Sequence, residues 1–353
     1  MTSEMAPGDT AVAETLMRRE TREAPARIAD MLARNHEAVA ALGERLRASP
    51  PALVVTCARG SSDHAATYGK YLVETMLGVP VTSAAPSVAS LFAPVARQRS
   101  GVGHALCLAI SQSGRSPDLL ASVDAQATDG AIVAALVNDE SSPLAARANV
   151  LLPLRSGPET SVAATKSCLG AMAGLAALVA AWSQDAALAR AVAALPDSLE
   201  RAIATDWSAG IAPLRDVSQM FVLGRGYGLG IAQECALKLK ETCAIQAEPF
   251  SSAEVRHGPM TIVRDGFPVL ALATSDAAGD DVVTAAQEFA ARGAAVLLAC
   301  AGRDGTLPAA ADHPVIEPIL MLASFYGMVE QLARARGRDP DRPPFLAKVT
   351  ETQ

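Results

Sequence analysis

Residues 234–242 read ECALKLKET and place two acids and two lysines inside an otherwise apolar, helix-forming stretch. At about 100° per residue, Glu234, Lys238 and Glu241 lie on one helical face, because they are spaced i, i+4 and i+7. Such a stripe can be a solvated ladder of ion pairs, each stabilising a helix by about 0.2–0.5 kcal/mol. It can also be a reaction centre, since a carboxylate in a water-poor pocket can take and return a proton. Lys240 lies on another face and is expected to be structural.

Two glycine- and serine-rich loops, ARGSSD (58–63) and SQSGRS (111–116), each follow a predicted strand and precede a predicted helix. Backbone N–H groups at a helix start, together with serine hydroxyls, can bind a phosphate group. Serine and glycine also serve as ordinary helix caps and turn residues, so each loop alone is a weak signal. Together the loops predict one anion site, whose candidate residues are Gly60, Ser61, Ser62, Ser111, Gln112, Ser113 and Ser116.

The corresponding loops of the second half, GRGYGLG (224–230) and TSDAAGD (274–280), carry fewer hydroxyl groups. We therefore expect the first half to hold the anion and the second half to do something else. GRGYGLG lacks the GxGxxG spacing and the chain has no Walker GK[ST] sequence, so neither a dinucleotide nor a P-loop nucleotide is predicted.

The elements that carry these residues form an internal repeat. Short β-branched runs alternate with helical runs, which is typical of βαβ units and a parallel sheet covered on both faces. The same order recurs about 165 residues later. VVTCARG corresponds to MFVLGRG, LCLAISQSG to VLALATSDA, GAIVAALVND to GAAVLLACAG and NVLLPL to PVIEPI. The chain is therefore predicted to be α/β, with two tandem units that are each a doubly wound parallel sheet in three α/β/α layers.

The predicted organisation has five parts along the chain. A helical lead-in with a break at Pro25 precedes the first unit, which should bind the anion. A linker follows, then a second unit that carries Glu241 and His257, then a tail that carries Lys348. The boundaries are 1–48 for the lead-in, 49–195 for the first unit, 196–215 for the linker, 216–337 for the second unit and 338–353 for the tail.

The composition excludes several functional classes. A net charge of −7, a pI near 5.3 and no basic cluster leave no electrostatic reason to expect a nucleic-acid partner. The six cysteines are scattered in apolar segments without metal-type spacing, which is typical of reduced core residues in a cytoplasmic protein. No export signal opens the chain, and no membrane partner is expected. The uncharged run from Cys168 to Trp182 is shorter than the roughly 20 residues that span a bilayer, and predicts a buried helix.

These motifs together resemble SIS (sugar isomerase) domain proteins over nearly the whole chain. Within that family the chain resembles the isomerase half of glucosamine-6-phosphate synthase and, more closely, stand-alone deaminases and deglycases of amino-sugar phosphates. The two predicted units would then be SIS units. The motifs that carry the resemblance, in family order, are ARGSSD, ISQSGRS, SVAATKS, GRGYGLGIAQECALKLKET, AEVRHGPM and LAKVT.

The resemblance implies a division of roles among the candidate residues. It implies that the two serine loops hold a sugar phosphate and that Val162 and Ala163 line the open-chain sugar. Glu241 would move a proton between C1 and C2, His257 would help to open the sugar ring, and Lys348 could form an imine with the ketose. The histidine of this family often comes from the neighbouring subunit, so a homodimer is implied. No cofactor or metal is implied.

Other interpretations of the same residues stay open at this point. Without the resemblance, His257 in a polar turn would be a surface or capping histidine, and Lys348 would be a solvated tail lysine. Lys238 and Glu234 are expected to be the electrostatic neighbours of Glu241. The positive charge of Lys238 favours the ionised form of Glu241, whereas burial raises the pKa of Glu241. The sequence does not determine which of the two effects is larger.

Departures from the synthase shape the functional expectation. Thr2 follows Met1 where the synthase has the nucleophilic cysteine of its glutaminase domain, so we expect no use of glutamine within this chain. Ala164 stands where the synthase has a serine, and Arg59 where it has a cysteine, so the substrate pocket should differ. The leading expectation is a deaminase that converts glucosamine 6-phosphate to fructose 6-phosphate and ammonia.

Four alternatives accompany that expectation. Three are enzymes: a fructosamine-6-phosphate deglycase, a galactosamine-6-phosphate deaminase/isomerase and a synthase-like aminotransferase (isomerizing) without its own glutaminase. The fourth is a non-catalytic SIS regulator that senses a phosphosugar. Such regulators carry a DNA-binding unit ahead of the SIS fold, and we expect no unit of ordinary size in the acidic, short lead-in.

Overall fold

Each half of the chain forms a five-stranded parallel sheet in the computed structural model, which describes residues 14–92, 104–346 and 348. The first sheet has the order β2-β1-β3-β4-β5 and the second the order β10-β9-β8-β6-β7, so counterpart strands occupy counterpart places. The strands are β1 (Leu53–Cys57), β2 (Val81–Ser83), β3 (Ala105–Ser111), β4 (Ile132–Val137), β5 (Val150–Pro153), β6 (Gln219–Gly224), β7 (Gln246–Ser251), β8 (Pro268–Ala273), β9 (Ala295–Ala301) and β10 (Leu307–Ala309). The predicted α/β class with two repeated units is confirmed.

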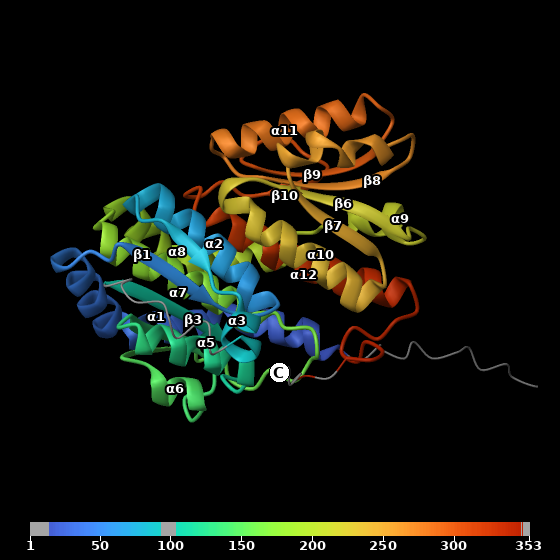
Figure 1. Cartoon of the computed structure of the whole chain (residues 1–353). Coiled ribbons are helices and arrows are strands. Elements are labelled where there is room, and N and C mark those ends of the chain that lie inside the picture. Colours follow the sequence, from blue (N-terminus) through green and yellow to red (C-terminus); the bar gives the residue numbers. More distant parts are fainter. Residues whose placement is uncertain (1–13, 93–103, 347, 349–353) are drawn as a thin grey trace, which may run out of the picture.

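The helices cover both faces of both sheets (Figure 1). One face of the first sheet packs on α5, and the outer face of the second sheet packs on α11. The two inner faces share one core with the helices between them, among them α2, α7, α10 and α12. The helices are α1 (Leu16–Ala48), α2 (Ser61–Leu77), α3 (Pro86–Leu91), α5 (Pro117–Thr128), α6 (Pro143–Arg147), α7 (Lys166–Ser183), α8 (Ala186–Ala204), α9 (Ile211–Leu214), α10 (Leu229–Cys243), α11 (Ala277–Ala290) and α12 (Glu317–Ala335).

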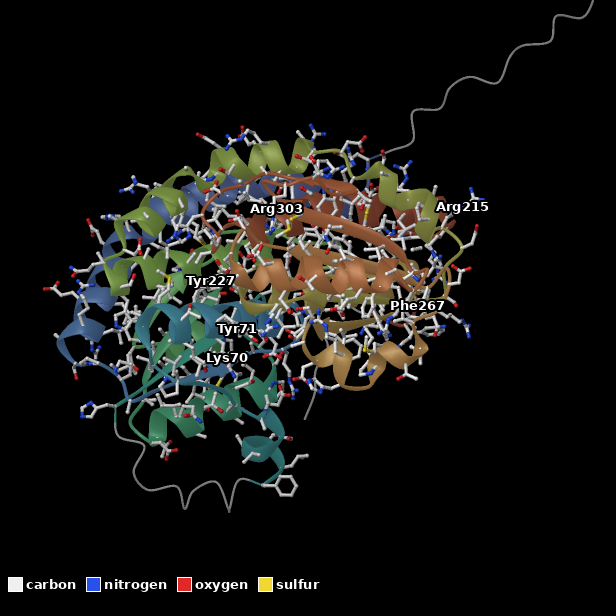
Figure 2. All side chains as sticks on the ribbon, turned by 90° about the horizontal axis from the view of Figure 1, so that it is seen from above. Lys70, Tyr71, Arg215, Tyr227, Phe267 and Arg303 are labelled. Carbon is white, nitrogen blue, oxygen red and sulfur yellow. The ribbon has the colours of Figure 1, made fainter. Side chains whose placement is uncertain are left out.

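The two units meet where α2 lies against α10. Gly230 makes this approach possible, because a Cβ atom there would lie 2.5 Å from the backbone oxygen of His64. Near the same boundary the hydroxyls of Thr75 and Tyr227 are 2.9 Å apart, and Tyr227 lies beside the part of α2 that carries Lys70 (Figure 2). The close crossing brings side chains of α10 up to the first turn of α2.

Two sequence expectations about local structure are wrong. Helix α1 runs without a break through Pro25, because an apolar stripe buried against α7 outweighs the roughly 3 kcal/mol that an interior proline costs. PVIEPI (314–319) is no strand: Pro318 lies in the first turn of α12, where a missing N–H is harmless, and β10 takes the edge position instead. The expected end of the first unit, residue 195, falls inside α8.

Helix α7 is the apolar helix that the sequence predicted. By length and composition alone it is the one helix of the described residues that could cross a membrane, yet 78% of its apolar window is buried inside the protein. Gly43 of α1 lets this helix pack closely on α7, because a Cβ added to Gly43 would lie 3.0 Å from the Ala181 backbone. All six cysteines are free and buried, as predicted.

Candidate active site

A cavity of about 270 Å³ opens at the carboxyl edge of the first sheet. It lies beyond the ends of β1 and β3, where the strand order reverses and where ligands bind in doubly wound sheets. Eight of the nine predicted substrate-binding residues line it. They are Gly60, Ser61, Ser62, Ser111, Gln112, Ser113, Ser116 and Val162.

The ninth predicted residue, Ala163, does not line the cavity. Its side chain is fully buried in the shared core, and the next residue, Ala164, lines the cavity instead. Successive residues of an irregular loop turn to different sides, so the motif alone did not identify which alanine faces the ligand.

Two helix N-termini converge on this cavity. Gly60 turns the chain into α2 with φ 54° and ψ −131°, a conformation open to glycine but strained for other residues. Neither Gly60 nor Ser116, the residue before α5, caps its helix with a side-chain hydrogen bond. Within the described part of the chain, the Ser61 N–H at the start of α2 and the Ser116 hydroxyl before α5 donate no hydrogen bond, so both can bind an anion.

The start of α11 in the second unit corresponds to the start of α5, but it is already capped by a side chain. Asp276 caps α11 with its own carboxylate, accepting a hydrogen bond from the Gly279 N–H at 3.0 Å and from the Thr274 hydroxyl at 2.6 Å. The carboxylate of Asp276 already occupies this helix start, which disfavours a second anion there. The structure thus gives a physical reason for the expected asymmetry between the units.

The charged stripe of α10 lies inside the protein. Glu234 and Lys238 are each 1% exposed, while the side chain of Glu241 is 20% exposed and lines the cavity. The Lys238 Nζ lies 2.6 Å from Glu241 Oε2 and 3.3 Å from Glu234 Oε1. This burial excludes the solvated ladder of ion pairs.

Glu234 forms polar contacts that join α10 to the first unit. It accepts hydrogen bonds from the Ser61 hydroxyl at 2.9 Å and the Tyr326 hydroxyl at 3.1 Å, and it lies 2.8 Å from His64 Nδ1. Burial pushes the pKa of Glu234 upward, but the charges of Lys238 and His64 and the hydrogen bonds outweigh it and hold the pKa below its usual value. Glu234 is therefore a carboxylate at neutral pH.

Lys238 is correspondingly a fixed cation. Burial alone would lower its pKa, yet the charges of Glu234 and Glu241 outweigh burial and raise it. Its Nζ also donates to the Ser61 hydroxyl at 3.1 Å. The ammonium thus connects the cavity carboxylate, the buried carboxylate and the first serine loop.

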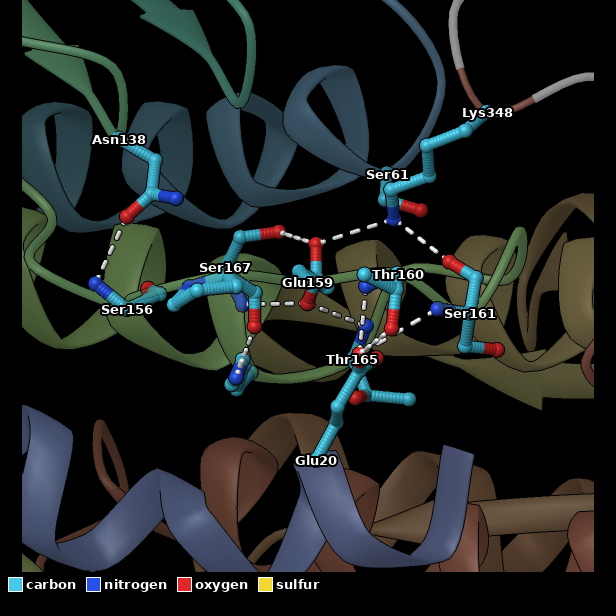
Figure 3. Close-up of polar contacts among 12 residues, drawn as sticks. Glu20, Ser61, Asn138, Ser156, Glu159, Thr160, Ser161, Thr165, Ser167 and Lys348 are labelled. Carbon is cyan, nitrogen blue, oxygen red and sulfur yellow. Dashed lines mark hydrogen bonds and ion pairs between the residues drawn. The ribbon is translucent and has the colours of Figure 1, made fainter. Parts of the chain in front are cut away.

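Lys348 reaches the cavity from the tail (Figure 3). Its Nζ donates to the Ser161 carbonyl at 2.7 Å and lies 3.4 Å from Glu159 Oε2. Glu159 is itself buried and accepts a hydrogen bond from the Ser167 hydroxyl at 2.6 Å. The lysine is therefore held at the cavity wall by the loop that precedes α7.

Helix α1 organises that same loop. Glu20 is 4% exposed and accepts hydrogen bonds from the Thr160 N–H at 2.5 Å, the Thr160 hydroxyl at 3.0 Å and the Ser161 N–H at 3.3 Å. The lead-in thus supports the backbone that carries Val162 and that receives Lys348.

Replacing Glu20 with alanine is expected to lower the free energy of unfolding by about 1–3 kcal/mol, because three donors, of which the Ser161 N–H is buried, lose their acceptor. Urea unfolding measures this change. Glu37→Ala, on the exposed side of the same helix, is the matched control and should leave the unfolding midpoint unchanged. Equal midpoints for the two variants would contradict a supporting role for Glu20.

His257 is not brought to the cavity of its own chain. It ends a short 3-10 helix, Glu254–His257, where its side chain is exposed and outside the cavity wall. The predicted residues thus divide into two groups within one chain: Glu241, Lys348 and the serine loops share a cavity, and His257 lies apart from it.

Several residues of the site were not named as site residues by sequence reasoning. Arg59, Ser167 and Cys168 line the cavity, and five further residues hold its walls in place. Arg59 lies within a motif that was recognised, whereas His64 and Tyr326 show no local signal. The five residues that hold the walls are Glu20, His64, Asp118, Glu159 and Tyr326.

Comparison with known proteins places this architecture in a family. The SIS domain model matches residues 52–181 and 213–336. The glutamine–fructose-6-phosphate aminotransferase [isomerizing] of Methanothermobacter thermautotrophicus is 32% identical over 350 residues, which cover 96% of this chain and 57% of that protein. The chain thus spans a little over half the length of this relative.

Two crystal structures share the fold. A protein provisionally named a phosphosugar isomerase, from Silicibacter pomeroyi DSS-3, is 42% identical with a TM-score of 0.87, over 93% of this chain and 100% of that one. Glucosamine-6-phosphate deaminase from Thermotoga maritima has a TM-score of 0.76 over 96% of this chain and 100% of that one, at 21% identity, a likeness of fold alone. With two matched segments that include both sheets, the chain belongs to the SIS domain family.

Proposed function

We propose that the chain is an amino-sugar phosphate deaminase that converts glucosamine 6-phosphate to fructose 6-phosphate and ammonia. One observation carries the proposal: the Glu241 carboxylate lines the same cavity as the two serine loops and Lys348. An anion site, a proton-transferring carboxylate and an amine within about 270 Å³ suit a phosphorylated open-chain sugar.

The reaction consists of a proton transfer followed by a hydrolysis. Glu241 removes the proton from C2 of the open-chain aldose, the C–H electron pair forms a C1=C2 double bond, and O1 takes up a proton from solvent, which gives the enolamine. The first proton returns from Glu241 to C1 while the nitrogen releases a proton to solvent, which leaves an imine at C2. Water then adds to that imine, and ammonia leaves as the C2 ketone forms. Lys238, 2.6 Å from Glu241, stabilises the negative charge that the carboxylate carries before and after the transfer.

The proposal is tested by incubating the purified protein with glucosamine 6-phosphate and measuring fructose 6-phosphate and ammonia. Equimolar release of both products is expected. Turnover of galactosamine 6-phosphate or a fructosamine 6-phosphate instead would change the substrate and keep the reaction class. Binding of these sugars without any turnover would refute the enzyme and favour a phosphosugar sensor.

A second candidate function is favoured by the relatives. The matched aminotransferase is named for a reaction of glutamine with fructose 6-phosphate, and this chain aligns with a little over half of it. In that case the cavity would run the reverse reaction with ammonia supplied by another protein. Formation of glucosamine 6-phosphate from fructose 6-phosphate and ammonia, faster than its breakdown at matched concentrations, would support this candidate.

The proposal includes a homodimer in which His257 of a second copy helps to open the sugar ring. The exposed position of His257, outside the cavity of its own chain, supports this arrangement. His257→Asn and Glu241→Gln should each lower kcat about 10²–10⁴-fold, because each removes a proton-transferring group. Mixing the two variants should restore up to a quarter of the wild-type activity, since one site of a mixed dimer is intact. No restoration in mixed dimers proven to form would contradict it.

A further inference from the structure

We propose that Arg59 is an anion-binding residue whose guanidinium bridges Asp118 and the phosphate of the ligand. The inference rests on the anion site of the proposed function and does not require the reaction. Arg59 lines the cavity and directly precedes Gly60, the residue that turns the chain into α2.

Asp118 fixes the orientation of the guanidinium. It lies in the first turn of α5 and is 1% exposed. Its Oδ2 accepts a hydrogen bond from Arg59 Nε at 3.0 Å and a second one from Arg59 Nη2, while its Oδ1 accepts from the Leu119 N–H at 2.8 Å. The arginine is therefore held between the N-terminus of α2 and that of α5, where the anion would lie.

The guanidinium keeps donors for a ligand. It has five N–H groups in a planar fork, and two of them point to Asp118. Within the described part of the chain, no residue accepts a hydrogen bond from the remaining three. Arginine is suited to this double duty, because its fork can hold a carboxylate on one edge and a phosphate on another.

The charges of the site make this cation important. A phosphate monoester carries a charge of about −1.5 to −2 at neutral pH. The acids around the cavity outnumber the bases, and all three cations face carboxylates: Lys238 faces Glu234 and Glu241, Lys348 faces Glu159, and Arg59 faces Asp118. Of the three, Arg59 is the one that lies between the two helix starts. If Arg59 were removed, its positive charge would no longer lie between the carboxylate of Asp118 and the phosphate, and these two negative charges would repel each other.

Arg115 provides a matched control. It belongs to the second serine loop and has the same charge and exposure, with side chains 51% exposed for Arg115 and 52% for Arg59. Arg115 pairs with Asp139 at 2.7 Å and does not line the cavity. The two arginines thus have the same charge and similar exposure, but only Arg59 lines the cavity.

The test measures the Kd of inorganic phosphate and of glucosamine 6-phosphate by calorimetry. Arg59→Gln is expected to raise both Kd values about 10- to 100-fold, and the effect should shrink at high salt, because a unit charge near the phosphate is lost. Arg115→Gln should change them less than twofold. The Kd of unphosphorylated glucosamine should not respond to either substitution, which separates anion binding from a general structural effect.

Arg59→Lys keeps the charge and loses the fork, so a smaller rise in Kd, about threefold, is expected. Circular dichroism checks that each variant folds. A Kd for phosphate within twofold of wild type in Arg59→Gln, or in Arg59→Lys if the glutamine variant does not fold, would overturn the inference. Failure of the wild-type protein to bind any phosphate compound would overturn the anion site itself and the proposed function with it.

Discussion

Replacing Glu241 with glutamine is expected to lower kcat with glucosamine 6-phosphate about 10²–10⁴-fold, while the Kd of the sugar changes little. Glutamine keeps the size of the side chain and its hydrogen bond from Lys238, but its amide cannot accept the C2 proton. Because the two serine loops and Lys348 are untouched, binding should survive. Steady-state kinetics together with a direct binding measurement separate the two quantities.

The internal repeat supplies the control for this substitution. Glu74 is the counterpart of Glu241 on α2, but its carboxylate accepts the Val81 N–H at 3.0 Å and lies outside the cavity wall. Glu74→Gln should therefore leave kcat within about twofold of wild type. If Glu241→Gln also retained full activity, the assignment of the proton-transferring group would be wrong whatever the substrate.

Replacing Lys238 with methionine is expected to lower the free energy of unfolding by about 3–5 kcal/mol. The lysine is 1% exposed and neutralises Glu234, which is equally buried, so methionine leaves a carboxylate in the core without its main counter-charge. Urea unfolding followed by circular dichroism measures the loss. In the Lys238→Met/Glu234→Gln double variant the buried charge is gone as well, and part of the stability should return.

The pH dependence distinguishes this account from simple loss of packing. In the wild type the pKa of Glu234 is held below its usual value, so its contribution is present at neutral pH and is lost as the pH falls below about 4.5 through the lowered pKa. In Lys238→Met, burial dominates and raises that pKa. The penalty should then be largest at pH 7 and shrink toward pH 5, as the buried carboxylate takes up a proton.

The control for Lys238→Met is an exposed ion pair. Arg34 and Asp30 on α1 are 2.7 Å apart with side chains 62% and 47% exposed. Asp30→Asn should leave the unfolding midpoint unchanged, because solvated pairs contribute little. A penalty for Lys238→Met that stayed constant between pH 7 and pH 5 would show that lost contacts, rather than an isolated charge, explain the destabilisation.

The parts of the fold and of the candidate site that depend on local sequence patterns were predicted from the sequence. The repeat of strand, turn and helix predicted both sheets, because each pattern depends on neighbours along the chain. Helical spacing placed Glu234, Lys238 and Glu241 on one face, and the structure places that face against α2. Loop position after β1 and β3 predicted that the two serine loops would meet.

What the sequence could not predict depends on contacts between distant segments. The role of Glu20 requires α1 to lie beside residues 158–165, a separation of about 140 residues. Likewise, Asp341 of the tail caps α1 by accepting from the Leu16 and Met17 N–H groups, each at 2.7 Å, and its carbonyl accepts from the Val162 N–H at 3.3 Å. Neither acid differs locally from a surface residue.

The most direct test of the account follows the C2 proton of glucosamine 6-phosphate by proton NMR in D2O, with ammonia measured in parallel. The wild-type protein is predicted to remove the C2 proton signal, to form fructose 6-phosphate and to release one ammonia per sugar, while Glu241→Gln leaves the spectrum unchanged. A wild-type protein that binds the sugar, yet leaves the C2 proton in place and releases no ammonia, would contradict proton transfer in this cavity.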